Sequence, residues 1–125
     1  MDKFRVFVYG SLRKNCGNHD LLSKSEYEGN YIVHGFDMYS NGSFPMIIEG
    51  DNEIIVESYL VDKSTLNKLD TLEGHPTFYT RKKYIAYSKD KSENKVGYIY
   101  IGNKNHLDNF KLKINSGNWI DNQEN

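Results

Sequence analysis

Glu73 is the residue whose position in this sequence points most clearly to chemistry. It lies in segment 62–74, which has the spacing of an amphipathic helix with Leu66, Leu69 and Leu72 on its apolar face. At about 100° per residue, Glu73 falls on that same face. Burial and the negative end of the helix both disfavour its charged form, so we expect a raised pKa. Such a carboxylate suits general acid/base catalysis near neutral pH.

The neighbours of Glu73 leave two interpretations open. Asp70 lies one helical turn earlier and adds like-charge repulsion if it is ionised, which favours the catalytic interpretation. In the structural interpretation, Glu73 turns outward just before Gly74 or forms an ion pair with Arg81 or a lysine. The helical pattern alone does not choose between them.

A turn at the end of a predicted strand, 4–9, is the second candidate site. It consists of Tyr9, Gly10, Ser11, Leu12 and Arg13. Gly10 lets the backbone approach a ligand closely, and successive N–H groups in such a turn can bind a carboxylate or an oxyanion. Strand–Gly–Ser turns are also common in β-rich proteins as plain connections. The spacing differs from that of a phosphate-binding loop, so we do not expect nucleotide binding.

The remaining polar residues indicate neither a metal nor a redox site. The four histidines lack the close pairing of a zinc site; they are His19, His34, His75 and His106. Cys16 is the only cysteine, so no disulfide can form within the chain. We therefore expect no metal and no cofactor.

Composition excludes several classes of protein. With 125 residues, the chain has the length of one domain. Its 16 basic and 17 acidic residues give a formal net charge of -1, so we expect no binding to nucleic acid or to acidic membranes. No apolar run approaches the roughly 20 residues of a membrane span, and the first residues do not form a secretory signal. We expect a cytoplasmic protein; the sequence does not indicate its oligomeric state.

Ten tyrosines beside a single alanine favour strands over helices. We predict strands at 4–9, 27–39, 44–49, 54–61, 78–87 and 96–101, with bulges or bends at Gly29 and Gly35 and a turn at 50–52. Segment 62–74 is the one main helix, 18–23 is a short helical turn capped by Asn18, and 105–114 is ambiguous. The tyrosines then form barrel and core packing.

Short strands joined mostly by tight turns predict an α+β domain. Its core is a partly closed, mostly antiparallel β-barrel with one main helix and short helical turns. The domain is predicted to span 1–120, with a polar tail at 121–125.

Several motifs together resemble the gamma-glutamyl cyclotransferase-like family. They occur in collinear order over nearly the whole chain: Val6 to Leu12, Asn18-His19 with Leu22, Ser58 to Asp62, Leu69 to Gly74, Pro76 with Tyr79 to Arg81, and Ser116 to Trp119. The Tyr-Gly-Ser-Leu element followed about sixty residues later by Leu-Asp-x-x-Glu-Gly is the most specific combination. The sequence looks most similar to the gamma-glutamylamine cyclotransferase branch.

This resemblance implies a mixed β-barrel enzyme that releases 5-oxoproline from gamma-glutamyl compounds without a cofactor. It implies Glu73 as the catalytic acid/base and Tyr9, Gly10, Ser11 and Leu12 as the substrate-binding element, the two places that the residue patterns also indicate. The substrate's own α-amine is then the nucleophile, and Tyr79 and Tyr100 are further candidates for the pocket wall. The expected partner is a small gamma-glutamyl molecule.

Two features leave the finer assignment open. Glu57-Ser58 and Asn118 depart from residues that are frequent in the family, so the branch, and with it the leaving amine, stays undetermined. The alternative function is a non-catalytic module that binds a small molecule or a partner through the same pocket.

Overall fold

The computed structural model describes residues 2–120. Its strands are β1 Phe4–Val8, β2 Glu26–Ser40, β3 Pro45–Val61, β4 Tyr79–Tyr87, β5 Asn94–Gly102 and β6 Leu112–Lys113. Its helical elements are the α-helix α1 Lys63–Glu73 and the 3₁₀ turns η1 His19–Leu22 and η2 Lys104–Asn109. The ambiguous segment 105–114 therefore contains most of η2 and all of β6. The predicted tail at 121–125 lies outside the described residues, and the domain boundary stays a prediction.

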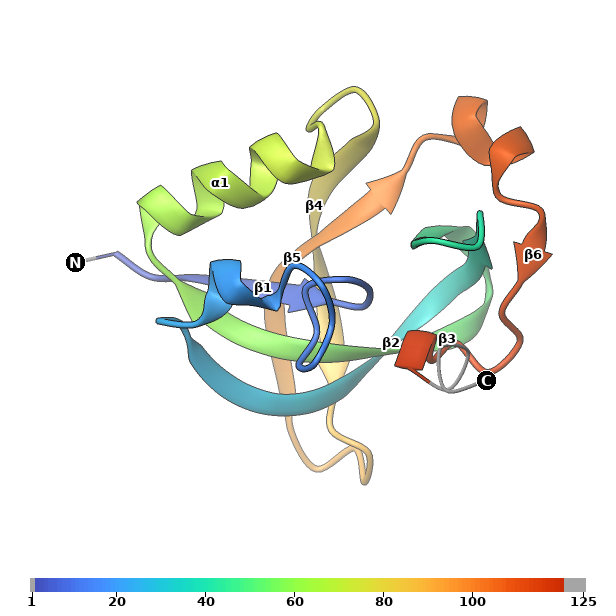
Figure 1. The fold of residues 1–125 in the computed structure, drawn as a ribbon. Helices are drawn as coiled ribbons and strands as arrows, with labels where there is room; N and C mark the ends of the chain where they lie inside the picture. The colour runs from blue at the N-terminus through green and yellow to red at the C-terminus, as the bar shows by residue number, and fades with distance from the viewer. Residues whose placement is uncertain (1, 121–125) are drawn as a thin grey trace.

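Five strands close into a mixed barrel, which confirms the predicted fold class (Figure 1). The order β3-β1-β5-β4-β2 returns to β3, because β2 and β3 form a long antiparallel hairpin. β1 and β5 are parallel, whereas the other neighbouring strands are antiparallel. Only Ile32 and Tyr87 pair between β2 and β4, so the barrel is narrowly closed on that side.

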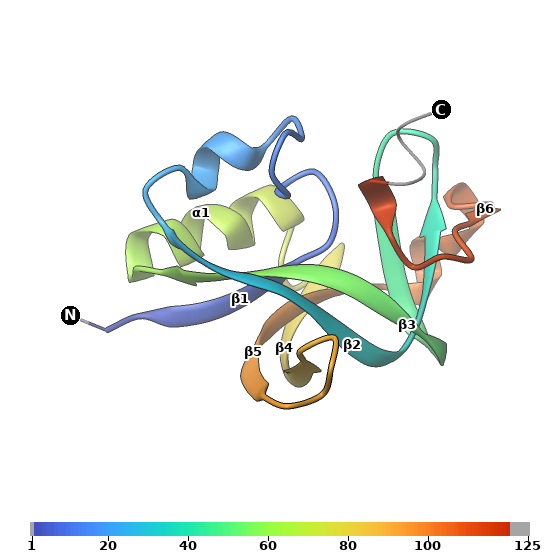
Figure 2. The same cartoon turned by 90° about the horizontal axis from the view of Figure 1, so that it is seen from below.

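Two apolar cores lie on opposite faces of β1. Val6 and Val8 belong to the core that receives Leu66 and Leu69 from α1. Phe7, between them, packs in the second core, as expected from the alternation of side chains along a strand. Figure 2 shows α1 alongside η1 on one side of the curved sheet. This packing fixes the position of the last turn of α1 relative to the end of β1.

The predicted turn at 50–52 is wrong. β3 runs through these residues without interruption, and its pairing with β2 resumes on both sides, at His34 with Glu53 and at Phe36 with Glu49. The three residues are thus accommodated as a bulge opposite Gly35. A second register shift occurs near Gly29, as predicted. The irregularities bend the hairpin without ending either strand, because the flanking residues keep their partners.

The predicted ends of the main helix are confirmed. Asp62 is the N-cap, and its carboxylate accepts a hydrogen bond of 2.7 Å from the Thr65 N–H. Gly74 ends the helix in the left-handed conformation, with φ of 65°, where a side chain would be strained. Helix termination at this point places Glu73 in the final turn, beside the chain that leads into β4.

Candidate active site

Both candidate sites lie in one pocket of about 540 Å³. Its wall includes Glu73 from α1 and all four predicted loop residues, Tyr9, Gly10, Ser11 and Leu12. The other lining residues are Phe7, Val8, Asn18, Ser43, Phe44, Pro45, Thr71, Leu72, Gly74, Phe78, Tyr79 and Tyr100. No Lys, Arg or Asp is among them, so within the described part of the chain, residues 2–120, Glu73 supplies the only carboxylate of a largely apolar wall.

Glu73 is on the buried side of α1, as the helical period predicts. Leu66 and Leu69 are fully buried, and the carboxylate follows them on that face. Leu72 departs from the prediction: it is 42% exposed and lies at the edge of the apolar stripe. Glu73 itself is half-buried, and its side chain has no hydrogen-bond or ion-pair partner within residues 2–120. Loss of water therefore raises the pKa of Glu73 to about 7.

The expected repulsion from Asp70 is wrong. Arg81 holds the Asp70 carboxylate with two hydrogen bonds, of 2.9 and 3.2 Å, and the Tyr100 hydroxyl donates a third of 2.6 Å. A neighbouring cation thus compensates the charge of Asp70, and burial is the cause of the raised pKa of Glu73. Because Arg81 is bound to Asp70, the expected alternative of an ion pair between Arg81 and Glu73 is not formed.

The turn after β1 lines the pocket. Within residues 2–120, the N–H groups of Gly10, Ser11 and Leu12 have no acceptor. Gly10 is required by close packing, because a Cβ there would lie 2.8 Å from the Pro45 ring. Asn18 is the N-cap residue of η1, as predicted, but its side chain makes no cap bond: the side-chain amide donates instead to the Ser11 hydroxyl at 2.9 Å. Asn18 therefore supports the loop.

Three tyrosines form a wall whose hydroxyl groups are already used. Tyr9 donates to the Tyr100 carbonyl at 2.6 Å, Tyr79 donates to the Pro45 carbonyl at 2.7 Å, and Tyr100 donates to Asp70. Burial is the main cause that raises the pKa of each tyrosine, and the charge of nearby Glu73 adds to the shift. The three rings therefore shape the pocket and stay neutral. Tyr79 and Tyr100 line it as expected, whereas Arg81 is not among the lining residues.

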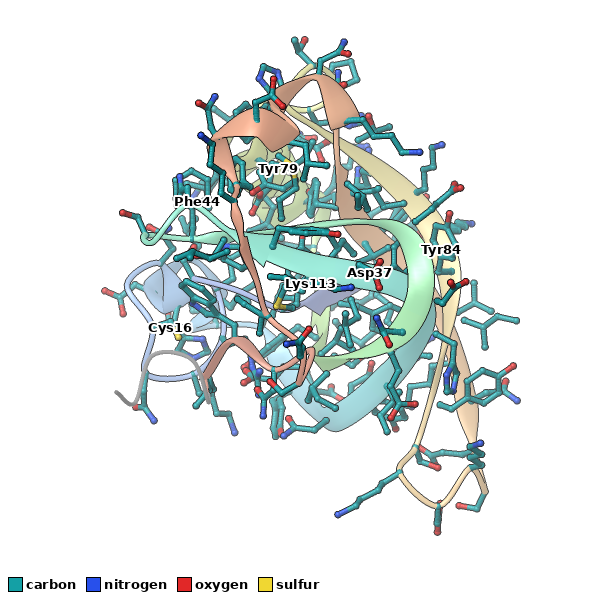
Figure 3. The ribbon with its side chains drawn as sticks, turned by 90° about the vertical axis from the view of Figure 1, so that its right-hand side faces the viewer. Cys16, Asp37, Phe44, Tyr79, Tyr84 and Lys113 are labelled. Carbon is teal, nitrogen blue, oxygen red and sulfur yellow. The ribbon has the colours of Figure 1, made fainter. Side chains whose placement is uncertain are left out.

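Sequence reasoning missed the aromatic residues on the opposite wall. Phe44, between β2 and β3, and Phe78, before β4, both line the pocket, and both contact the Phe110 ring, Phe44 in an edge-to-face arrangement and Phe78 in a tilted one. Figure 3 labels Phe44 beside Tyr79 at this side of the molecule. Phe44 is 37% exposed. The signal in the sequence was an aromatic residue directly after the polar turn residues Asn41-Gly42-Ser43.

A buried ion pair behind the loop was missed as well. Arg13 and Glu57 are joined by a hydrogen bond of 2.8 Å, although neither residue lines the pocket. The signal was a glutamate within the mostly apolar run 54–61, where a carboxylate must find a partner.

Residues 2–120 contain neither a metal-binding cluster nor a membrane-spanning helix. Within residues 2–120, no group of His, Cys, Asp and Glu side chains is arranged to hold a metal ion. Among the helices of the same residues, none has the length and apolar character needed to cross a membrane.

Comparison with known proteins identifies relatives of the whole chain. A protein of Vibrio cholerae, whose name proposes gamma-glutamylcyclotransferase activity, is 35% identical over 117 residues, which are 91% of this chain and 93% of the relative. The gamma-glutamylcyclotransferase family protein YtfP of Escherichia coli K12 is 31% identical over 121 residues, covering 94% and 96% of the two chains.

Solved structures show the same fold. An AIG2-like protein from Mus musculus superposes with a TM-score of 0.72 at 20% identity, covering 81% of this chain and 78% of the mouse chain. The family model for gamma-glutamyl cyclotransferase, AIG2-like, matches residues 6–121, which include both candidate elements of the pocket. The chain therefore belongs to the gamma-glutamyl cyclotransferase, AIG2-like family.

Proposed function

We propose that this protein releases 5-oxoproline from a gamma-glutamyl amine or amide, with Glu73 as the general acid/base. The observation that carries the proposal is an unpaired carboxylate, with a pKa raised to about 7, in the same pocket as three unpaired backbone N–H groups. A base poised near neutral pH and a cluster of oxyanion donors are what an acyl transfer to an amine requires.

In the proposed reaction the substrate supplies its own nucleophile. Ionised Glu73 takes a proton from the substrate α-ammonium group, and the freed amine attacks the γ-carbonyl carbon. A carbon–nitrogen bond closes the five-membered ring, and the bond to the leaving nitrogen breaks as Glu73 returns the proton to that nitrogen. The ring nitrogen then loses its second proton, which the liberated amine takes up. The products are 5-oxoproline and a free amine, and neither water nor a cofactor is consumed. Holding the substrate folded supplies much of the rate, because the reacting groups belong to one molecule.

The loop after β1 binds the acidic part of the substrate in this proposal. The N–H groups of Gly10, Ser11 and Leu12 hold either the α-carboxylate or the oxyanion that develops on the γ-carbonyl. Tyr9 completes the turn and, together with Tyr79 and Tyr100, excludes water from the reacting atoms. The departing amine then faces the apolar wall.

The test is direct detection of 5-oxoproline. Purified protein is incubated with gamma-glutamyl amines and gamma-glutamyl amino acids, and 5-oxoproline and glutamate are both quantified. The proposal expects 5-oxoproline without glutamate, since attack by the α-amine excludes hydrolysis. Glu73→Gln is expected to lose about 10²–10⁴-fold in kcat, the usual contribution of a general acid/base.

Glu49→Gln is the matched control, because Glu49 is an exposed glutamate of β3 outside the pocket. It is expected to keep wild-type turnover. Full activity in Glu73→Gln would contradict the role of Glu73. If no substrate yields 5-oxoproline while ligands still stabilise the fold, the protein is the non-catalytic binding module instead.

A further inference from the structure

The Arg13–Glu57 ion pair lies directly behind the substrate-binding loop. Both residues are only 3% exposed, and the Arg13 Nε donates to the Glu57 Oε2 at 2.8 Å. Neither lines the pocket, so neither can touch a substrate bound there. Any influence of this pair on the reaction must pass through the backbone of the loop.

Glu57 ties both ends of the loop to one point on β3. It is the register partner of Val8, the last residue of β1, where the loop begins. Where the loop ends, the Glu57 side-chain carboxylate accepts a hydrogen bond from the Arg13 guanidinium. Its Oε1 also accepts one from the backbone N–H of Lys14, at 2.9 Å. The Tyr59 hydroxyl donates to Oε1 as well, at 2.9 Å. Residues 9–12 therefore form a short loop, and Glu57 is bound to the chain at both of its ends.

A third element supports the arginine. Arg13 Nη1 donates to the Asn118 Oδ1 at 2.6 Å, and the backbone next to Asn118 is itself bound to β3, since Ile55 N–H donates to the Gly117 carbonyl at 2.9 Å. The guanidinium is thus held from two directions, which restricts its rotation. Charge-assisted hydrogen bonds of this kind are short and directional.

A buried ion pair of this kind fixes the conformation of the loop more than it increases the stability of the fold. Replacing a buried ion pair by apolar side chains is often neutral or stabilising, because burial of two charges is costly. The directional hydrogen bonds of the Arg13–Glu57 pair, however, favour one conformation of the loop backbone. Among the described residues 2–120, the N–H groups of Gly10, Ser11 and Leu12 have no acceptor to hold them, so the anchors on either side must set their direction.

We propose that Arg13 and Glu57 are positioning residues, which hold the loop so that its N–H groups converge on the acidic part of the substrate. This inference rests on the proposed function. A misplacement of about 1 Å in a binding element can cost about 100-fold in rate, so distortion of the loop is expected to be expensive even when the barrel stays folded.

The experiment compares Glu57→Gln, Arg13→Lys and the apolar double variant Arg13→Met/Glu57→Leu with wild type. Thermal unfolding measures stability, and steady-state kinetics on a gamma-glutamyl substrate separates KM from kcat. Amide hydrogen exchange follows the Arg13 and Asn18 N–H groups, which donate to the Gly10 and Ser11 carbonyls and report on the loop.

The proposal expects a KM raised about 10-fold or more in all three variants, and faster exchange confined to the loop. It also expects that the double variant regains stability while its KM stays high. A purely structural role would lower kcat in proportion to the folded fraction and leave KM unchanged.

Two results would overturn the proposal: a double variant that regains both stability and wild-type KM, or loop exchange that is unchanged in every variant. Failure of the proposed function is recognised separately, because wild type would then form no 5-oxoproline whatever the exchange data show.

Discussion

Glu57 and Glu73 both lose contact with water when the chain folds, but only the Glu57 carboxylate gains hydrogen-bond partners within residues 2–120. Glu57 is almost fully buried and receives hydrogen bonds from the Arg13 guanidinium, the Lys14 N–H and the Tyr59 hydroxyl. Glu73 is half-buried and has no partner within residues 2–120. Its pKa is raised to about 7 by burial alone.

The comparison shows that partners, not burial, decide what a carboxylate can do. A carboxylate whose oxygens are all engaged holds its neighbours in place and has no free lone pair for a substrate proton. A carboxylate that is desolvated but unpaired has a pKa close to neutral pH, so it can both take up and release a proton. The pocket wall therefore contains the second kind, and the scaffold behind the loop contains the first.

Removal of the paired carboxylate is expected to have the largest effect on stability. Glu57→Ala leaves the buried Arg13 guanidinium uncompensated, which costs about 3–5 kcal/mol in the free energy of unfolding. Urea denaturation at neutral pH measures this loss. An effect no greater than that of Glu49→Ala would show that the two buried charges do not depend on each other.

Removal of the unpaired carboxylate is expected to act in the opposite direction. The folded pKa of Glu73 is about 7 against an ordinary value of 4.5, so the folded state binds the proton more tightly. Below about pH 4.5 the carboxyl is neutral in both states, and stability is lost as the pH rises through about 7. Glu73→Gln should therefore be about 1–3 kcal/mol more stable than wild type at about pH 8, after allowance for solvent screening.

That gain should disappear at about pH 4, where wild type and Glu73→Gln carry the same neutral group. Urea denaturation at the two pH values measures the difference directly. Equal stability at both values, or a variant that is weaker at about pH 8, would mean that Glu73 is solvated or paired in solution.

The smallest expected effect concerns the compensation of Asp70. Arg81→Gln removes the guanidinium that binds this carboxylate, so its negative charge then acts on Glu73 one helical turn away. The pKa of Glu73 should rise, and kcat/KM at about pH 7 should fall a few-fold while recovering at higher pH. A uniform loss across the pH range would indicate that Arg81 acts on the fold and not on Glu73.

Local sequence rules were sufficient for the elements that carry the site. The helical period placed Glu73 with Leu66 and Leu69, and Gly74 marked the end of that helix. The turn after the first strand was recognisable from its glycine. These signals are local, because each depends on residues within one turn of helix or one strand end.

The features that sequence could not predict depend on pairing between distant segments. Arg81 meets Asp70 because β4 passes the end of α1, and Glu57 meets Arg13 across 44 positions. Similarly, residues 50–52 have the composition of a turn, but their neighbours in β3 keep their pairing with β2. In each case the tertiary partner overrides the local preference, and a single sequence does not show which partner is available.

The pH dependence of kcat/KM for 5-oxoproline formation is the most direct test of the central claim that Glu73 is the general acid/base. Because the reaction begins with ionised Glu73, the rate should fall on the acidic side with a midpoint near the Glu73 pKa of about 7. Glu73→Gln should lack both the activity and this limb. An acidic limb near pH 4.5, or one that persists in Glu73→Gln, would contradict the assignment.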